Sequence, residues 1–128
     1  MIDMSKLQRG RSWRWSKAGS HTVEVAHHTV GGDNVWCVYL SVNERDDLFA
    51  SHAADDSVWA EYLSAIPLHG GCTYAKVIKH DRGSVLKIGC DFNHIDDRLA
   101  GCGPEVVPSE VMRTAEDLNT YMQERGSK

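Results

Sequence analysis

The chain has 128 residues, of which 41% are hydrophobic and 25% are charged, and its formal net charge is −4. This length and composition are typical of one globular domain, residues 1–128. The mild charge argues against a general nucleic-acid binder and against a strong DNA mimic. No apolar run approaches the roughly 18–20 residues that cross a bilayer, so we expect no membrane segment.

The N-terminal segment combines cations with two tryptophans. Residues 1–10 lack the apolar core of a signal peptide, and we expect a flexible lead-in and a cytoplasmic protein with reduced cysteines. Beyond it, tryptophans alternate with polar residues, which predicts a strand with one buried face. The weaker alternative is a nucleic-acid contact, since aromatic rings among cations can stack on bases. Its residues would be Arg11, Trp13, Arg14 and Trp15.

Two further strands follow. Residues 21–28 favour a second strand, and residues 30–34 have the composition of a turn. The near-continuous apolar run at 35–42 is typical of a strand that is buried on both faces. We therefore predict that residues 35–42 form the central strand of a sheet.

An acidic stretch occupies residues 43–56 and predicts a solvated loop. Its Glu44, Asp46 and Asp47 are candidate binding residues, because an acidic loop can dock on a basic partner surface. Residues 57–66 have apolar side chains at helical spacing, which predicts a short middle helix.

The next segment predicts a β-hairpin. Two stretches rich in strand-favouring residues, 72–79 and 84–92, flank a turn. A three-residue loop at 81–83 would pair Ile78 with Leu86. Since side chains alternate along a strand, this register would collect most apolar side chains of the hairpin on one face.

The outer end of this hairpin would gather polar residues that are far apart in the sequence. Imidazole and carboxylate groups at one rim can carry out acid–base chemistry, with a histidine as base and an aspartate orienting it. Paired glycines offer backbone N–H groups to an anion. The candidates are His69, Asp91 and His94 for catalysis, Gly70, Gly71 and Thr73 for binding, and Asp97 for a divalent metal.

The same residues also have a purely structural interpretation. Gly70 and Gly71 can serve an unusual backbone path, and His69 can cap a loop. Asp91 can accept a hydrogen bond from the Thr73 hydroxyl. The sequence leaves both interpretations open.

The cysteines suggest a zinc site only superficially. His69-x-x-Cys72 and Cys90-x-x-x-His94 have the spacing of two half-sites. However, the expected register directs Cys72 and Cys90 into the apolar face, where cysteine serves as a small hydrophobic residue. We therefore expect no cofactor, with a divalent metal at the rim as the open alternative.

HGG-C-TY, followed after a short hairpin by IGCDFNHIDD, resembles a pattern of small phage and prophage proteins. That pattern is roughly HGG-x-T-[YF], then G-[FC]-D-x-x-H-x-x-D, with a helical tail. The match covers Leu68 to about Asp97, and loosely the last helix. The resemblance implies a viral or prophage context and no particular reaction. The matching positions are His69, Gly70, Gly71, Thr73, Tyr74, Gly89, Asp91, His94 and Asp97.

The C-terminal part predicts a loop at 98–107 and then a helix that begins near Pro108. Apolar residues recur at helical spacing as far as Met122, so this helix should lie across the sheet, and residues 124–128 should fray. The whole chain predicts an α+β fold. We expect an antiparallel sheet of about four to five strands, with a short middle helix and a C-terminal helix packed on one face.

Two classes of function follow. The favoured one is a phage- or prophage-type accessory protein that binds a host or defence-system protein, in an inhibitory or host-takeover role. It is favoured because no nucleophile–base–orienter set is complete. The alternative is a small hydrolase or nucleotide-processing enzyme that uses the His/Asp cluster at the hairpin edge, with or without a metal. The sequence does not decide whether the protein is an enzyme, nor its oligomeric state.

Overall fold

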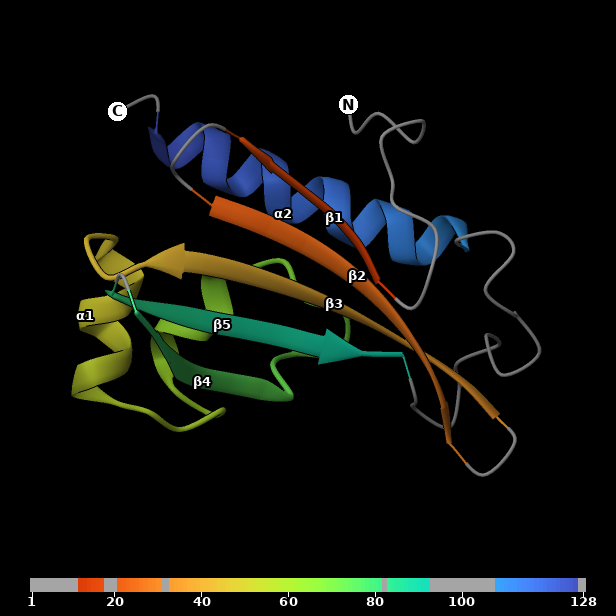
Figure 1. The fold of residues 1–128 in the computed structure, drawn as a ribbon, viewed down its shortest axis with the longest axis horizontal. Helices are drawn as coiled ribbons and strands as arrows, with labels where there is room; N and C mark the ends of the chain where they lie inside the picture. Colours follow the sequence, from red (N-terminus) through yellow and green to blue (C-terminus); the bar gives the residue numbers. More distant parts are fainter. Residues whose placement is uncertain (1–11, 18–20, 31–32, 82, 93–107, 127–128) are drawn as a thin grey trace.

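The computed structural model describes residues 12–17, 21–30, 33–81, 83–92 and 108–126 (Figure 1). Several predictions from the sequence fall outside these residues. They are the lead-in at 1–10, the loop at 98–107, and the candidate residues Arg11, His94 and Asp97.

One five-stranded antiparallel sheet runs through the molecule. Its strands are β1 (Ser12–Lys17), β2 (His21–Val30), β3 (Asp33–Asn43), β4 (Tyr74–His80) and β5 (Gly83–Asp91). They lie in the order β1-β2-β3-β5-β4, so β3 is the central strand, as predicted (Figure 1).

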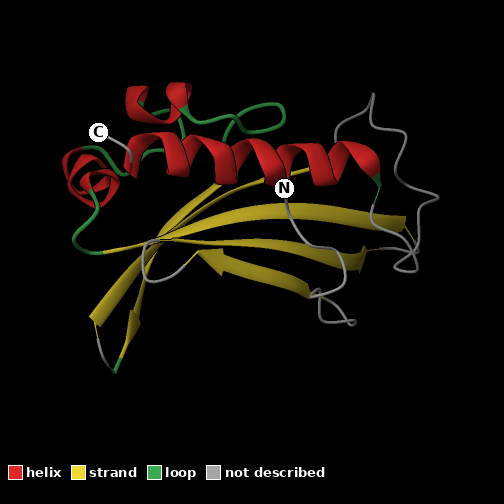
Figure 2. Cartoon of the chain, turned by 90° about the horizontal axis from the view of Figure 1, so that it is seen from above, coloured by secondary structure: helices red, strands yellow, loops and turns green. Residues whose placement is uncertain are grey.

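The helices lie together on one face of this sheet (Figure 2). They are α1 (Asp47–Ala54), the short 3₁₀ helix η2 (Glu61–Ala65) and α2 (Ser109–Gly126). This arrangement confirms the predicted α+β class with a C-terminal helix packed on one face.

The main core lies between the sheet and the helices. From α2 it takes four residues of the predicted stripe, each at most 6% exposed, while Met112 and Tyr121 of that stripe are partly buried and pack against the core. From β3 and β5 it takes alternate residues, as expected where one face of a strand is buried. The four buried α2 residues are Val111, Ala115, Leu118 and Met122, and the strand residues are Trp36, Val38, Leu40, Val42, Leu86, Ile88 and Cys90.

The middle of the chain differs from the prediction. The acidic stretch that we expected to be a loop contains α1, while the stretch 57–66 forms only the 3₁₀ helix η2. Asp46 begins α1 as its N-cap, and Leu48 and His52, four residues apart, are its buried side chains. Since only these two side chains are buried, the apolar stripe of α1 is too narrow to recognise from the sequence.

The register of the hairpin β4–β5 also differs. His80 pairs with Gly83, so the loop has two residues, and Ile78 pairs with Val85 rather than Leu86. β4 has apolar residues on both faces, and such a strand specifies its register weakly. The one-residue shift turns Val77 to the helix-covered face, beside Leu86, and Ile78 to the opposite face.

A β-bulge ends the pairing at the start of β4. Tyr74 pairs with Gly89, and the backbone N–H of Thr73 also donates to the Gly89 carbonyl, at 2.9 Å. Two residues of one strand thus oppose a single residue of its neighbour. The bulge changes the direction of the chain where the His69-Gly70-Gly71 turn enters the sheet.

At its other end, the chain stays helical for longer than predicted. α2 extends to Gly126, past residue 124, where we expected fraying to begin.

Candidate functional site

The two glycines of the predicted site adopt a backbone conformation that favours glycine. Gly70 has φ +66° and Gly71 has φ +91°, and both are exposed. A Cβ atom added to Gly71 would meet no atom within 4 Å, so conformation, and not close packing, explains the residue. The structural interpretation therefore accounts for this pair.

His69 lies at the end of β5, as the fold-back predicts. Its ring stacks on the ring of Phe92, with 4.2 Å between the centroids and 17° between the planes. Phe92 is 2% exposed and belongs to the main core, and its N–H donates to the Trp36 carbonyl. This contact holds the His69 ring against the core, on the helix-covered side of β5.

The Asp91 side chain projects from the face of β5 that is opposite the helices. Asp91 pairs with Cys37, which belongs to a second, smaller apolar cluster on the opposite face of the sheet. Since consecutive residues of a strand alternate, Asp91 and Phe92 point to opposite faces. His69, stacked on Phe92, and Asp91 therefore do not share a face. The other two members of the predicted cluster, His94 and Asp97, lie outside the described residues, and their roles stay predictions.

Thr73, the remaining binding candidate of this rim, is exposed. Its backbone N–H is used in the bulge against Gly89. A structural role therefore accounts for its backbone, and its side chain faces solvent.

The cysteines near this rim belong to the fold. Cys90 is 1% exposed, and burial raises the pKa of its thiol to about 12. A hydrogen bond from the His69 backbone N–H lowers this pKa, but its effect is smaller than that of burial. Burial also raises the pKa of Cys72, whose S–H donates to the Tyr74 carbonyl at 3.1 Å. Metal ligation needs the thiolate, which these environments disfavour. Within the described part of the chain, no three His, Cys, Asp or Glu side chains are placed to hold a metal ion.

The acidic candidates have different roles. The Oδ1 atom of Asp46 accepts a hydrogen bond from the Leu48 N–H at 2.9 Å, which makes Asp46 a helix cap. Asp47 is exposed in the first turn of α1, where a negative charge is favourable. Glu44 is exposed and lines a pocket at the end of β3. Sequence reasoning recognised the acidity of this stretch and missed the cap.

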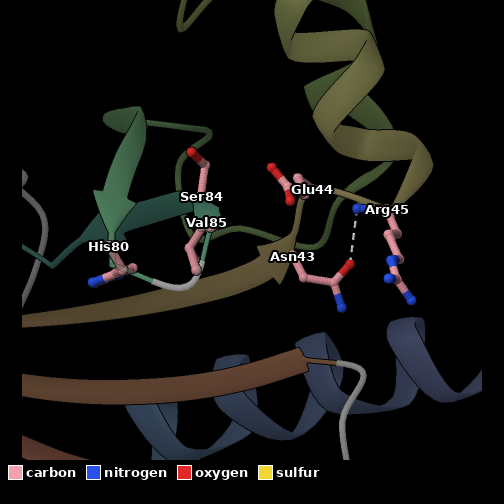
Figure 3. A pocket seen from close by; sticks show the side chains of 7 residues that line it. Asn43, Glu44, Arg45, His80, Ser84 and Val85 are labelled. Atoms are coloured by element: carbon pink, nitrogen blue, oxygen red, sulfur yellow. Dashed lines mark hydrogen bonds between the residues drawn. The ribbon is translucent and has the colours of Figure 1, made fainter.

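The pocket beside Glu44 has a volume of about 350 Å³ and lies between the end of β3 and the turn of the β4–β5 hairpin (Figure 3). The dashed line in Figure 3 marks a hydrogen bond from the backbone N–H of Arg45 to Asn43 Oδ1, at 2.9 Å. The side chains of His80 and Arg45 point away from each other. Charged groups therefore do not converge on one point, as a catalytic site would require. The lining residues are Asn43, Glu44, Arg45, His80, Gly83, Ser84 and Val85.

Trp59 is the feature that sequence reasoning missed. It is 90% exposed, although tryptophan is usually well buried. Its flanking residue Ala60 is 4% exposed and is part of the core. Exposed acids lie on both sides of it in the chain. We define the Trp59 surface as Asp55, Asp56, Trp59 and Glu61.

Local hydrogen bonds hold the turn that carries Trp59. The backbone N–H of Trp59 donates to Ser57 Oγ at 3.0 Å, and the backbone N–H of Ser57 donates to Asp55 Oδ1 at 3.1 Å. Nearby, the Nδ1 atom of the buried His52 is 3.1 Å from the Tyr62 hydroxyl, which ties α1 to η2. The tryptophan is therefore presented on a pre-ordered turn.

The face of the sheet opposite the helices carries a row of polar and aromatic side chains. The Tyr39 ring contacts the ring of Tyr74 edge-on, with 5.6 Å between the centroids. Lys87 Nζ lies 4.3 Å from the centre of the Tyr39 ring and 3.1 Å from the Glu24 carboxylate. Cross-strand contacts of this kind stabilise a sheet. The row joins β2, β3, β5 and β4.

The predicted strand at the N-terminus is confirmed as β1, in which Trp13 pairs with Val25 and Trp15 with Val23. The side chains of β1 are outside the described part, so the nucleic-acid alternative stays a prediction.

Comparison with known proteins adds no relative. No protein-family model, no curated protein and no solved structure shows a significant match to this chain. Among the described residues, no helix combines the length and the apolar character needed to cross a membrane.

Proposed function

We propose that the protein acts by binding a host or defence-system protein, as an accessory protein of phage or prophage type. The exposed Trp59 carries this proposal, because tryptophan is enriched among the residues that dominate protein interfaces. The turn is already ordered, so little conformational entropy is lost when a partner covers it.

The charge around Trp59 indicates the partner's chemistry. Asp55, Asp56 and Glu61 are exposed, and Glu44 and Asp47 add charge before and at the start of α1. A partner surface with an apolar pocket inside a basic rim would be complementary to this arrangement. The proposal implies a cytoplasmic location in the host cell, where the cysteines would be reduced.

The experiment is a quantitative pull-down from host lysate with the tagged protein at micromolar concentration. We expect Trp59→Ala to lose its specific partner, since truncating such an anchor costs about 2 kcal/mol or more, roughly thirtyfold in affinity. Asp55→Asn combined with Asp56→Asn should weaken the capture and reduce its dependence on salt.

The matched control neutralises two exposed acids on α2, Glu110→Gln with Asp117→Asn. It changes the net charge equally and should retain the partner. If no specific partner is recovered, or if Trp59→Ala retains the same partner in full, the proposal is wrong.

A further inference from the structure

β4 is an edge of the sheet, and among the described strands β5 is its only neighbour (Figure 1). The two-residue loop makes His80 and Gly83 the last hydrogen-bonded pair of the hairpin. Since bonding alternates along an antiparallel strand, the backbone groups of Ala75, Val77 and Lys79 point away from β5. These groups can pair with an added strand.

The exposed side chains of this edge include two lysines. Lys76 and Lys79 are exposed, and Val77 between them is 38% exposed. β4 contains no acid along its length, Tyr74–His80. Lysine on an edge strand opposes pairing with a second copy of the same strand. The same charges favour a strand that carries acids.

We propose that the edge of β4 binds an extended acidic segment of a partner protein, which adds to the sheet as a sixth strand. This inference goes beyond the proposed function, because it concerns a surface distinct from the Trp59 surface. Directly opposed residues of neighbouring strands share a face, which fixes the pattern of the segment. Acids lie opposite Lys79 and Lys76, and the two residues between them, opposite Ile78 and Val77, are apolar.

The probe is a synthetic peptide with a central Glu-Val-Val-Glu sequence and serine and threonine flanks. The comparison peptide has Lys-Val-Val-Lys at the same positions. Isothermal titration calorimetry at low salt should give at least about fivefold tighter binding of the glutamate peptide, from two exposed charge pairs. Equal binding of the two peptides, or binding of neither, overturns the proposal.

Charge reversal on the protein tests the site. Lys76→Glu combined with Lys79→Glu should reverse the preference, so that the lysine peptide binds more tightly. Arg113→Glu, at an exposed position of α2, is the control and should leave the preference unchanged. If the double variant keeps the original preference, the peptide binds elsewhere and the proposal is wrong.

Backbone pairing is tested separately. In an antiparallel added strand, the donors that face β4 belong to the residues opposite Lys79 and Val77. A glutamate peptide N-methylated at these two residues lacks those donors and should bind at least about tenfold more weakly, as loss of hydrogen bonds at a strand edge predicts. Val77→Pro removes a donor that points away from β5, so it should weaken binding while β4 stays paired. Unchanged affinity of the methylated peptide overturns strand addition. Trp59→Ala should bind the peptide normally, so failure of this inference and failure of the proposed function are distinguishable.

Discussion

Gly89 lies on the face opposite the helices, at a position that leaves no room for a side chain. A Cβ atom at this position would lie 2.7 Å from Cε1 of Tyr39 and 3.0 Å from the backbone carbonyl oxygen of Val38. The ring occupies the space that a side chain would take, while the bulge at Thr73 brings a second N–H to the Gly89 carbonyl. Glycine is therefore required here by close approach, in contrast to Gly71, which is required by its φ.

We predict that Gly89→Ala lowers the free energy of unfolding by about 1–3 kcal/mol, the usual cost of overpacking. Gly71→Ala should cost about 1–2 kcal/mol through its backbone conformation alone. Chemical denaturation measures both. Tyr39→Ala should rescue part of the Gly89→Ala loss and none of the Gly71→Ala loss. A Gly89→Ala protein as stable as the wild type would contradict the contact with Tyr39.

The buried Cys90 thiol makes the free energy of unfolding depend on pH in the alkaline range. Burial raises its pKa to about 12 in the folded protein, from an ordinary thiol value of 9.0. The unfolded thiol therefore ionises first, and the unfolded state binds fewer protons above pH 9. The contribution of Cys90 to stability is complete below pH 9 and is lost as the pH rises towards about 12.

Denaturation at about pH 8 and about pH 10.5 should show a loss of about 2 kcal/mol from this group, since one pKa unit corresponds to about 1.4 kcal/mol. Cys90→Ala should be less stable at both pH values and should show a smaller loss between them. An equal loss in the two proteins would assign the pH dependence to other groups.

At the scale of elements, α1 depends on its first residues. Asp46 satisfies the Leu48 N–H, one of the backbone donors that a helix leaves unpaired at its start. This explains why an acid stands at this position without any partner molecule. Glu44 and Asp47 differ from Asp46, because their exposed carboxylates accept no hydrogen bond from a described backbone donor of the helix.

Asp46→Ala should therefore lower the free energy of unfolding by about 1 kcal/mol, and Asp46→Asn should retain most of the stability, because an asparagine side chain also caps. Thermal denaturation compares the two variants. Equal destabilisation by both would indicate that the charge, and not the hydrogen bond, stabilises the helix.

β4 and α2 show which elements can be predicted from sequence. The α2 stripe from Val111 to Met122 has one apolar face, and that face alone determines where the helix packs. β4 has apolar residues on both faces, so its register depends on the length of the turn and on the bulge. The burial of His52 likewise depends on a contact with Tyr62 that local periodicity does not contain.

At the scale of the whole molecule, one main core joins the sheet to α2, α1 and η2. The α+β class was predictable because the sequence periodicity changes from strand to helix along the chain. The candidate site was only partly predictable. The fold-back does bring His69 to the end of β5, but alternation sends Asp91 to the other face.

A single shared core predicts cooperative unfolding. Leu118 is fully buried on α2, and Leu118→Ala should cost about 2–5 kcal/mol. The free energy of unfolding measured by hydrogen exchange of the β2 and β3 amides should fall by the same amount as that measured from the helical circular-dichroism signal. Loss of the helical signal while the sheet amides stay protected would show that α2 unfolds separately.

The contrast between Trp36, which is fully buried, and Trp59 gives the molecule a built-in optical reporter. An indole in water emits at longer wavelength and is reached by dissolved iodide, whereas one inside the core is shielded from it. A protein that covers Trp59 would blue-shift its emission and protect it from the quencher, so the interaction could be followed on the unlabelled chain.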